Sequence, residues 1–276
     1  MRKLIFILTM NTVILSTIII FSLKPGAEQT ITYFPLDHAI TFKKYYTHIQ
    51  VEDENNKQIA WTTFSLTDEI IYLRQDVALL FANGKLVGAR TKWQQNTDSI
   101  KIEEKIPYES HSYWNGITFH YGESHYANEE IRSVQQISTD ELFIGDNFHF
   151  KKATNKKERE TEKLLKQHTN HDLKVKWNKL ISYFNINQAN YNEIALTDIT
   201  LDKPLHFLNH SAEQVEQIIG QLWEGLYKNY LIPAFDSKSG DFDTYIPLIL
   251  IDKQETHLIV LFEINGEPMK LIQRFP

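Results

Sequence analysis

The chain of 276 residues carries 35 acidic and 29 basic residues, a net charge of −6, and no cysteine. The missing thiols exclude disulfides, cysteine nucleophiles, cysteine zinc sites and lipid attachment through sulfur. A net acidic chain is a poor ligand for nucleic acid, so no nucleic-acid partner is expected. Aromatic residues make up 12% of the chain, which predicts a packed core rather than disorder.

The longest apolar segment lies at the N-terminus. Residues 4–22 contain no charged side chain. About 19 residues rising about 1.5 Å each span about 28 Å, close to the hydrocarbon thickness of a bilayer. The sequence therefore predicts a transmembrane helix over residues 4–22 that contacts membrane lipid. The alternative is a cleaved signal peptide, but the apolar core of such peptides is usually only about 7–15 residues long. A small-x-small cleavage motif is also missing.

The flanking charges predict the orientation of this segment. Arg2 and Lys3 precede it, and only Lys24 follows closely. Positive residues favour the cytoplasmic side of a membrane. We therefore expect a single-pass membrane protein in which residues 1–3 form a cytoplasmic tip and residues 23–35 a linker. The rest of the chain is then expected to be extracytoplasmic, at the cell envelope.

The remaining residues predict an α+β body with two lobes. Residues 36–150 are rich in strand-forming residues and are expected to form a β-rich lobe. Asn83 and Gly84 stand between two apolar runs, the pattern of a two-residue hairpin. Ile131–Ile137 fits a helix and a strand equally well. Further strands are expected at Phe42–Gln50, Lys57–Leu66, Ser99–Ile106 and Ile117–Tyr126.

Residues 151–276 predict a basic helical segment followed by an α+β lobe with two helices and a C-terminal antiparallel meander. Residues 151–179 hold ten basic and four acidic residues, and they lack the helix breakers Gly and Pro. Apolar residues at helical spacing predict that one face packs on a core: Leu173, Trp177, Leu180, Ile181 and Phe184. A second helix is predicted from Ala212 to Tyr230, because Ser211 and Gln214 have the spacing of a capping box.

The C-terminal meander is predicted from two dense apolar runs, Ile246–Ile251 and His257–Ile264. Strands of this kind are usually buried on both faces, so helices should cover the sheet. Asn265 and Gly266 then turn the chain into a last strand, Pro268–Phe275.

The densest group of reactive side chains contains His111, His120, Glu123 and His125. Imidazole and carboxylate groups are common zinc ligands. On a strand, however, Glu123 and His125 share one face while His120 points to the other. The spacing also differs from the metalloprotease motif, in which two histidines lie four residues apart on a helix. We therefore assign no catalytic, cofactor-binding or metal-binding residue and expect no cofactor.

A second acidic group, Asp236, Asp241 and Asp243, suggests a calcium loop but fails the EF-hand pattern. Lys238 occupies a ligand position, and Pro247 stands where a bidentate glutamate is required. A solvated acidic loop is the simpler interpretation.

Two functions follow from these patterns. The first is a non-enzymatic, membrane-anchored interaction or regulatory module with a protein partner in or near the membrane. Residues 151–179 could additionally contact an anionic surface. In layout only, the chain is similar to the anchored regulators of Gram-positive cell-envelope sensor kinases, without sharing their motifs. The alternative is an anchored metal-dependent or hydrolytic enzyme that acts on envelope material through His120, Glu123 and His125.

Overall fold

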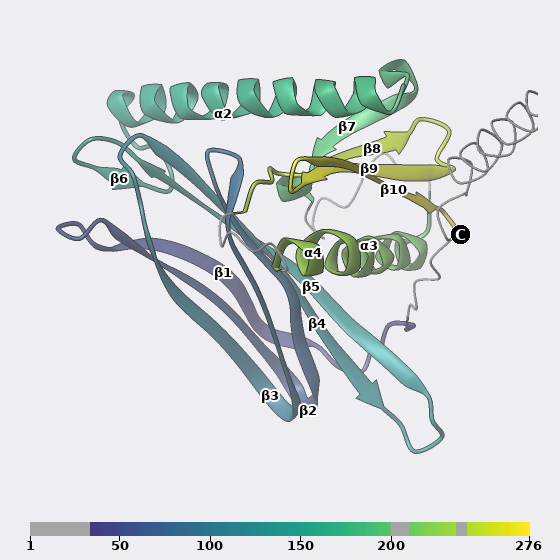
Figure 1. Ribbon diagram of the computed structural model, residues 1–276. Helices are drawn as coiled ribbons and strands as arrows, with labels where there is room; N and C mark the ends of the chain where they lie inside the picture. The colour runs from purple at the N-terminus through teal and green to yellow at the C-terminus, as the bar shows by residue number, and fades with distance from the viewer. Residues whose placement is uncertain (1–33, 200–209, 236–241) are drawn as a thin grey trace, which may run out of the picture. The chain divides into compact units, whose positions relative to one another are not determined.

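The computed structural model describes residues 34–199, 210–235 and 242–276, in which two antiparallel sheets hold most of the regular structure (Figure 1). The larger sheet has the order β1-β2-β4-β5-β6, and β3 pairs with β2 beside this path. Its six strands are β1 (Phe42–Asp53), β2 (Gln58–Ala82), β3 (Lys85–Pro107), β4 (Ser112–His125), β5 (Ile131–Ile144) and β6 (His149–Phe150). All of these described residues belong to the compact unit Tyr33–Pro276.

The smaller sheet has the order β10-β9-β8-β7, and every pair in it is antiparallel. Its strands are β7 (Tyr191–Ala195), β8 (Leu248–Asp252), β9 (His257–Ile264) and β10 (Glu267–Arg274). The helices are α2 (Lys156–Tyr183), α3 (Ala212–Leu226) and α4 (Ile232–Phe235). Short turns complete the described elements: η1 (Gln188–Asn190), η2 (Leu196–Asp198) and the π-helical turn η3 (Tyr227–Leu231).

The predicted α+β fold class is wrong, because the described chain is mostly β-structure. Two strands account for much of the difference. The sequence predicted separate short strands around Lys57–Leu66 and Ser99–Ile106, whereas the structure joins each of them to one arm of the Asn83-Gly84 hairpin. Strands β2 and β3 are therefore 25 and 23 residues long. The division into lobes at residue 150 stays a prediction.

The predicted hairpin between β2 and β3 is confirmed. Asn83 and Gly84 have φ values of 49° and 80°, as a turn with two left-handed residues requires. Farther along the same pair of strands the register shifts between Leu66 and Leu73. Before the shift β2 pairs with β1, and after it β2 pairs with β4. The ambiguous segment Ile131–Ile137 is a strand, within β5.

The inner face of the larger sheet encloses apolar residues in two groups. One group lies toward the β2–β3 hairpin and contains Ile49, Ile59, Trp61, Ala78, Leu80, Trp114, Leu142 and Ile144. The other lies near the register shift and contains Ile71, Leu73, Ile100 and Val134. Polar side chains that include His120 and Gln75 are also fully buried on this face.

Helix α3 lies between the two sheets (Figure 1). Its predicted capping box is confirmed: the Ser211 hydroxyl accepts the Gln214 N–H, and the Gln214 side chain accepts the Ser211 N–H. The helix continues farther than predicted, through η3 and into α4, which contains Pro233. Proline cannot donate the regular backbone hydrogen bond. The π-helical turn just before it changes the hydrogen-bonding register where that donor is missing.

Helix α2 runs along both sheets (Figure 1). The helix predicted in the basic segment is confirmed, with Leu173, Leu180 and Ile181 buried. The last two of these pack on β8 and β9, and the Trp177 indole donates to the carbonyl of Ile246 at 2.9 Å. The double burial predicted for the C-terminal strands is also confirmed. Leu248 and Leu250 face α2, whereas Ile249 and Ile251 belong to the core around α3.

The predicted membrane placement needs correction. Within residues 34–199, 210–235 and 242–276, no helix has the length and apolar character to cross a membrane. The predicted span, residues 4–22, and the cytoplasmic tip, residues 1–3, lie outside the described residues. The single-pass, extracytoplasmic assignment is therefore unsupported by the described structure, and no membrane placement enters the function proposed below.

Candidate functional site

Helix α3 covers only part of the outer face of the larger sheet. Trp223 of α3 stacks on Phe119 of β4, with ring centroids 5.4 Å apart and an interplanar angle of 9°. Side chains alternate along a strand, so Tyr121 follows Phe119 on the same face. Arg74 of β2 lies opposite both Tyr121 and Trp93 in the register. Beyond α3, the outer face of the sheet therefore continues as a row of side chains contributed by β2, β3 and β4.

We call this uncovered region the aromatic patch. Its residues are Tyr72 and Arg74 on β2, Trp93 on β3, and Tyr121, Glu123 and His125 on β4. Trp93 is 60% exposed, although tryptophan is mostly buried in folded proteins. The patch thus presents large apolar surface to solvent.

The rings of the aromatic patch contact one another. Tyr72 lies edge-on to Trp93, with centroids 5.9 Å apart, and to His125, with centroids 6.3 Å apart. The Arg74 guanidinium lies 5.8 Å from the ring centroid of Tyr72 and 5.6 Å from that of Tyr121. These distances are within the range of cation–π attraction. These contacts restrain the side chains of the aromatic patch.

Glu123 connects the charged residues of the patch. One of its oxygens lies 2.6 Å from Arg74 Nη1, and the other lies 3.2 Å from His125 Nε2. Its side chain is only 7% exposed, and a buried carboxylate requires such partners. Because both oxygens are engaged, Glu123 acts as the link that orients Arg74 and His125.

A groove of about 640 Å³ runs beside the aromatic patch. It lies where β2 and β3 bend and β4 ends, and Ile70 on its wall is 68% exposed. Its lining combines apolar, aromatic and polar side chains: Ala39, Ile40, Glu69, Ile70, Ile71, Tyr72, Gln95, Asn96, Glu123, Ser124, His125 and Tyr126. The groove and the patch together form a continuous surface of Trp, Tyr, Arg and Ile side chains.

A smaller groove of about 230 Å³ adjoins the first, and both are lined by Ile40. Asp37, on its wall, accepts hydrogen bonds from the Tyr126 hydroxyl at 2.5 Å and from the Ala39 N–H at 3.0 Å. Burial acts to raise the pKa of Asp37, but these hydrogen bonds hold it below its usual value. On the opposite wall, partial burial raises the pKa of Glu216.

His120 lies on the opposite, inner face of β4, as strand alternation predicts. The ring is fully buried, and burial lowers its pKa to about 3. Its Nδ1 lies 2.8 Å from the Ser65 hydroxyl, and its Nε2 lies 2.7 Å from the Ser138 hydroxyl. Both ring nitrogens are therefore used in the core, and His120 does not converge with Glu123 and His125.

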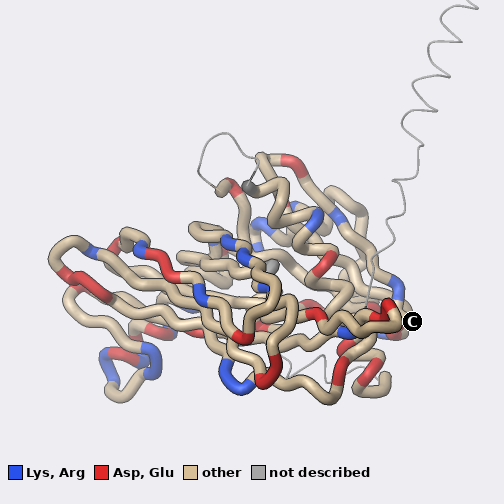
Figure 2. Tube along the Cα trace, turned by 90° about the horizontal axis from the view of Figure 1, so that it is seen from below, with Lys and Arg blue, Asp and Glu red and all other residues tan. Residues whose placement is uncertain are grey.

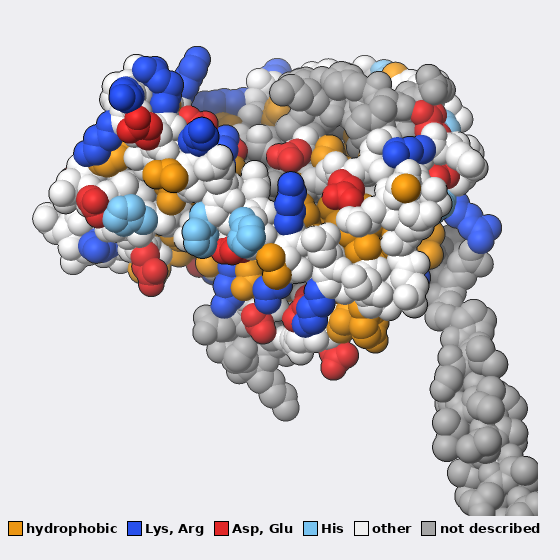
Figure 3. All heavy atoms as spheres, turned by 90° about the horizontal axis from the view of Figure 1, so that it is seen from above, with side chains coloured by type: hydrophobic (Ala, Val, Ile, Leu, Met, Phe, Trp, Pro, Cys, Tyr) orange, Lys and Arg blue, Asp and Glu red, His pale blue; other side chains and the backbone are white. Residues whose placement is uncertain are grey.

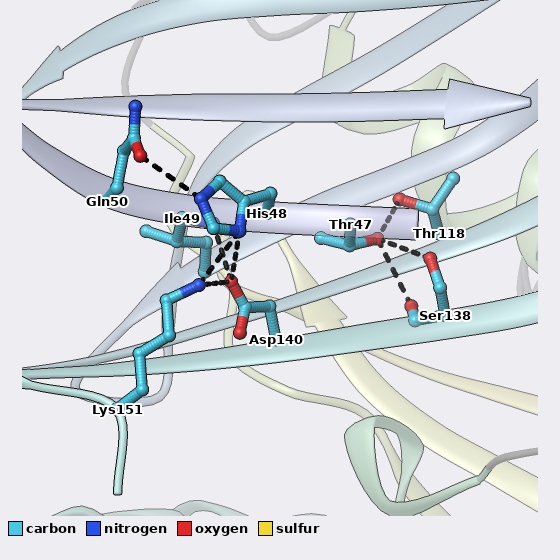
Figure 4. Close-up of polar contacts among 8 residues, drawn as sticks. All are labelled: Thr47, His48, Ile49, Gln50, Thr118, Ser138, Asp140 and Lys151. Carbon is cyan, nitrogen blue, oxygen red and sulfur yellow. Dashed lines mark hydrogen bonds and ion pairs between the residues drawn. The ribbon is translucent and has the colours of Figure 1, made fainter. Parts of the chain in front are cut away.

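Side chains connect β1 to β5 along the same inner layer (Figure 4). The Thr47 hydroxyl contacts the hydroxyls of Thr118 and Ser138 at 2.7 and 2.8 Å. Farther out, Asp140 accepts the Ile49 N–H at 2.6 Å and forms an ion pair with Lys151. These contacts join two strands that have no backbone ladder between them.

His48 on β1 also contacts side chains near Asp140 in this network between β1 and β5. His48 Nε2 lies 3.1 Å from Gln50 Oε1, which can only accept a hydrogen bond. His48 Nδ1 lies 2.9 Å from Lys151 Nζ, which can only donate. His48 Nδ1 also lies 3.6 Å from Asp140 Oδ2, so the ring contacts three neighbouring side chains (Figure 4). The side chains between β1 and β5 thus form a structural hydrogen-bond network.

The other residues singled out in the sequence are scattered. His111 lies 3.3 Å from Asp146, and both are largely exposed. Asp243 is exposed, and Asp236 and Asp241 lie outside the described residues. Across the part of the chain that the structure describes, no three His, Asp or Glu side chains are grouped closely enough to hold a metal ion.

Many basic side chains of residues 151–179 have intramolecular partners. Lys166 pairs with Glu141 and Glu162, and Lys176 lies 4.6 Å from the ring centroid of Tyr245. Seen from the side of α2, Lys and Arg side chains are interspersed with acidic and histidine side chains (Figure 3). Figure 2 shows the same mixing of charges along the strands. The predicted contact with an anionic surface stays a prediction.

Comparison with known proteins gives no relative for this chain: no protein-family model, no curated protein and no solved structure matches it. The interpretation of the site therefore depends on its geometry.

Sequence reasoning identified Glu123 and His125 but missed Tyr72, Arg74 and Trp93. The patch gathers residues from three strands, and their register could not be derived from the sequence. One local signal was available. Trp93 is a large apolar residue between Lys92 and the polar run Gln94-Gln95-Asn96, where no apolar face explains it.

Proposed function

We propose that this protein is a non-enzymatic interaction module that binds a polypeptide partner through the aromatic patch. The observation that carries the proposal is the exposed Trp93, in contact with the half-buried Tyr72 that Arg74 also contacts, beside the open groove. Trp, Tyr and Arg are the residues most enriched at the energetic centres of protein interfaces. Such side chains bind more tightly when they are ordered in advance, because less conformational entropy is lost on binding.

The geometry offers less support to an enzyme. The residues first considered for catalysis lie on two faces of β4, and His120 is sealed in the core by Ser65 and Ser138. Glu123 has both oxygens occupied. A general base must reach the proton that it abstracts, and neither residue has that freedom in this arrangement.

Site-specific crosslinking in cells tests the proposal. A photoreactive phenylalanine derivative at position 93, which keeps an aromatic ring there, should trap one discrete protein, and the product should disappear when Tyr72→Ala is added. The same amino acid at position 272 on β10, where Ile272 is also exposed, is the matched control and should not trap that protein. Equal trapping from both positions, or persistence of the product with Tyr72→Ala, would refute the assignment of the interface.

A further inference from the structure

One residue that lines the smaller groove, Gln135, has a buried hydrogen-bond acceptor without a partner. Gln135 on β5 is only 6% exposed, and its side-chain oxygen has no hydrogen-bond partner. Its amide nitrogen donates to the backbone carbonyl of Glu216 at 2.8 Å. A carbonyl can only accept, so this contact fixes which end of the amide is the oxygen. The oxygen therefore requires a donor that the described residues do not supply.

Carboxylates surround this acceptor. The two adjoining grooves are lined by Asp37, Glu69, Glu123 and Glu216, and their lining residues include no Lys or Arg. Asp37 and Glu123 are already bonded, the latter to Arg74 and His125. The Glu216 carboxylate has no hydrogen bond or ion pair within the described residues, although it is partly buried. A partly buried carboxylate gains stability from a cation placed beside it.

Within the described residues, no basic side chain forms an ion pair with Glu216. His38 lines the groove near Glu216, where its influence favours the charged carboxylate. Arg132 is paired with Glu130 at 2.7 Å. Glu213, in the first turn of α3, adds further negative charge. The local electrostatics thus favour a cation with N–H donors.

We propose that the smaller groove binds the guanidinium or ammonium group of a basic side chain on a polypeptide partner. The N–H groups would donate to Gln135 Oε1, and the positive charge would lie beside Glu216. The groove volume of about 230 Å³ can hold one long side chain. This inference rests on the proposed function for its setting, since the aromatic patch would hold the polypeptide that carries the basic residue.

A titration of the full chain with ethylguanidinium tests the inference without knowledge of the partner. Ethylurea has nearly the same shape but no charge, so it is the matched control compound. Saturable NMR shifts of the Gln135 side-chain amide are expected with ethylguanidinium and not with ethylurea. Equal shifts with both compounds, or no saturable shift at Gln135, would overturn the inference.

Three variants localise the binding. Glu216→Gln and Gln135→Leu should each weaken ethylguanidinium binding at least fivefold. Glu213→Gln, which removes one charge from the same helix outside the groove lining, should change it less than twofold. Melting curves confirm that each variant is folded. If Glu213→Gln and Glu216→Gln weaken binding equally, the cation responds only to the overall negative charge of this region. That result would refute the placement of the cation beside Glu216.

The two proposals can fail separately. If no crosslink forms from position 93 but ethylguanidinium still binds, the proposed partner interface is refuted and the proposed cation site is supported. If a crosslink forms from position 93 but ethylguanidinium does not bind, the proposed cation site is refuted and the proposed interface is supported.

Discussion

Arg74 on β2 and Glu123 on β4 form an ion pair of 2.6 Å at the part of the sheet that α3 leaves uncovered. This ion pair joins two strands of the sheet and also positions residues of the proposed interface. Its carboxylate is nearly buried, whereas its guanidinium also contacts the rings of Tyr72 and Tyr121. A stabilising contact of the sheet therefore also orders the aromatic side chains that would meet a partner.

Removal of Arg74 should destabilise the fold as well as the patch. Arg74→Ala leaves the Glu123 carboxylate with one unpaired oxygen, which costs about 1–3 kcal/mol. Urea unfolding should show this loss, and the double variant Arg74→Met with Glu123→Gln should recover part of it, because no buried charge is then left unpaired. A loss below about 0.5 kcal/mol for Arg74→Ala would contradict the role given to the pair.

Two tryptophans should separate stability from binding. Trp93→Ala removes an exposed side chain and should change the free energy of unfolding by no more than about 0.5 kcal/mol. Trp223→Ala removes a fully buried ring that stacks on Phe119 and should cost about 3–5 kcal/mol. Chemical denaturation measures both. A large cost for Trp93→Ala would show that this side chain belongs to the core.

His120 should make the fold sensitive to acid. Its pKa is about 3 in the folded protein and about 6.5 in an unfolded chain. Between these values the unfolded state binds more protons, so this contribution to stability is complete above about pH 6.5 and is lost as the pH falls toward 3. His120→Gln should be less stable at pH 7 but should lose less stability between pH 6.5 and 4. Parallel losses in both proteins would contradict this account.

Asp140 should hold β1 against β5. Asp140→Asn keeps an acceptor for the Ile49 N–H but loses the charge that faces Lys151, and should cost about 1 kcal/mol. Asp140→Ala also leaves the N–H unsatisfied and should cost about 1–3 kcal/mol. Hydrogen exchange at the Ile49 amide should quicken in the order wild type, Asn, Ala. An unchanged exchange rate in the Asp140→Ala variant would show that other contacts hold β1 against β5.

The sequence predicted local features better than the assembly. The Asn83-Gly84 turn, the Ser211 capping box and the doubly buried β8 and β9 depend on neighbouring residues, and all three are confirmed. The lengths of β2 and β3 were missed because polar residues interrupt their apolar runs near the bend. Those residues do not break the strands, since the pairing resumes with a shifted register.

The site shows the same limit. Alternation along β4 was enough to separate His120 from Glu123 and His125. The positions of Arg74 and Trp93 beside them depend on strand register across more than twenty residues of sequence, which no local pattern specifies. The partly buried Glu216 near Gln135 arises from tertiary packing of α3 on β5.

The affinity of the crosslinked partner for the Trp93→Ala variant tests the central claim most directly. Calorimetry with the purified partner should show at least a tenfold weaker Kd for Trp93→Ala than for the wild type, because a central aromatic side chain usually contributes more than about 1.4 kcal/mol. Ile272→Ala, the exposed control on β10, should bind like the wild type. An unchanged Kd for Trp93→Ala would contradict the proposal that the aromatic patch is the binding surface.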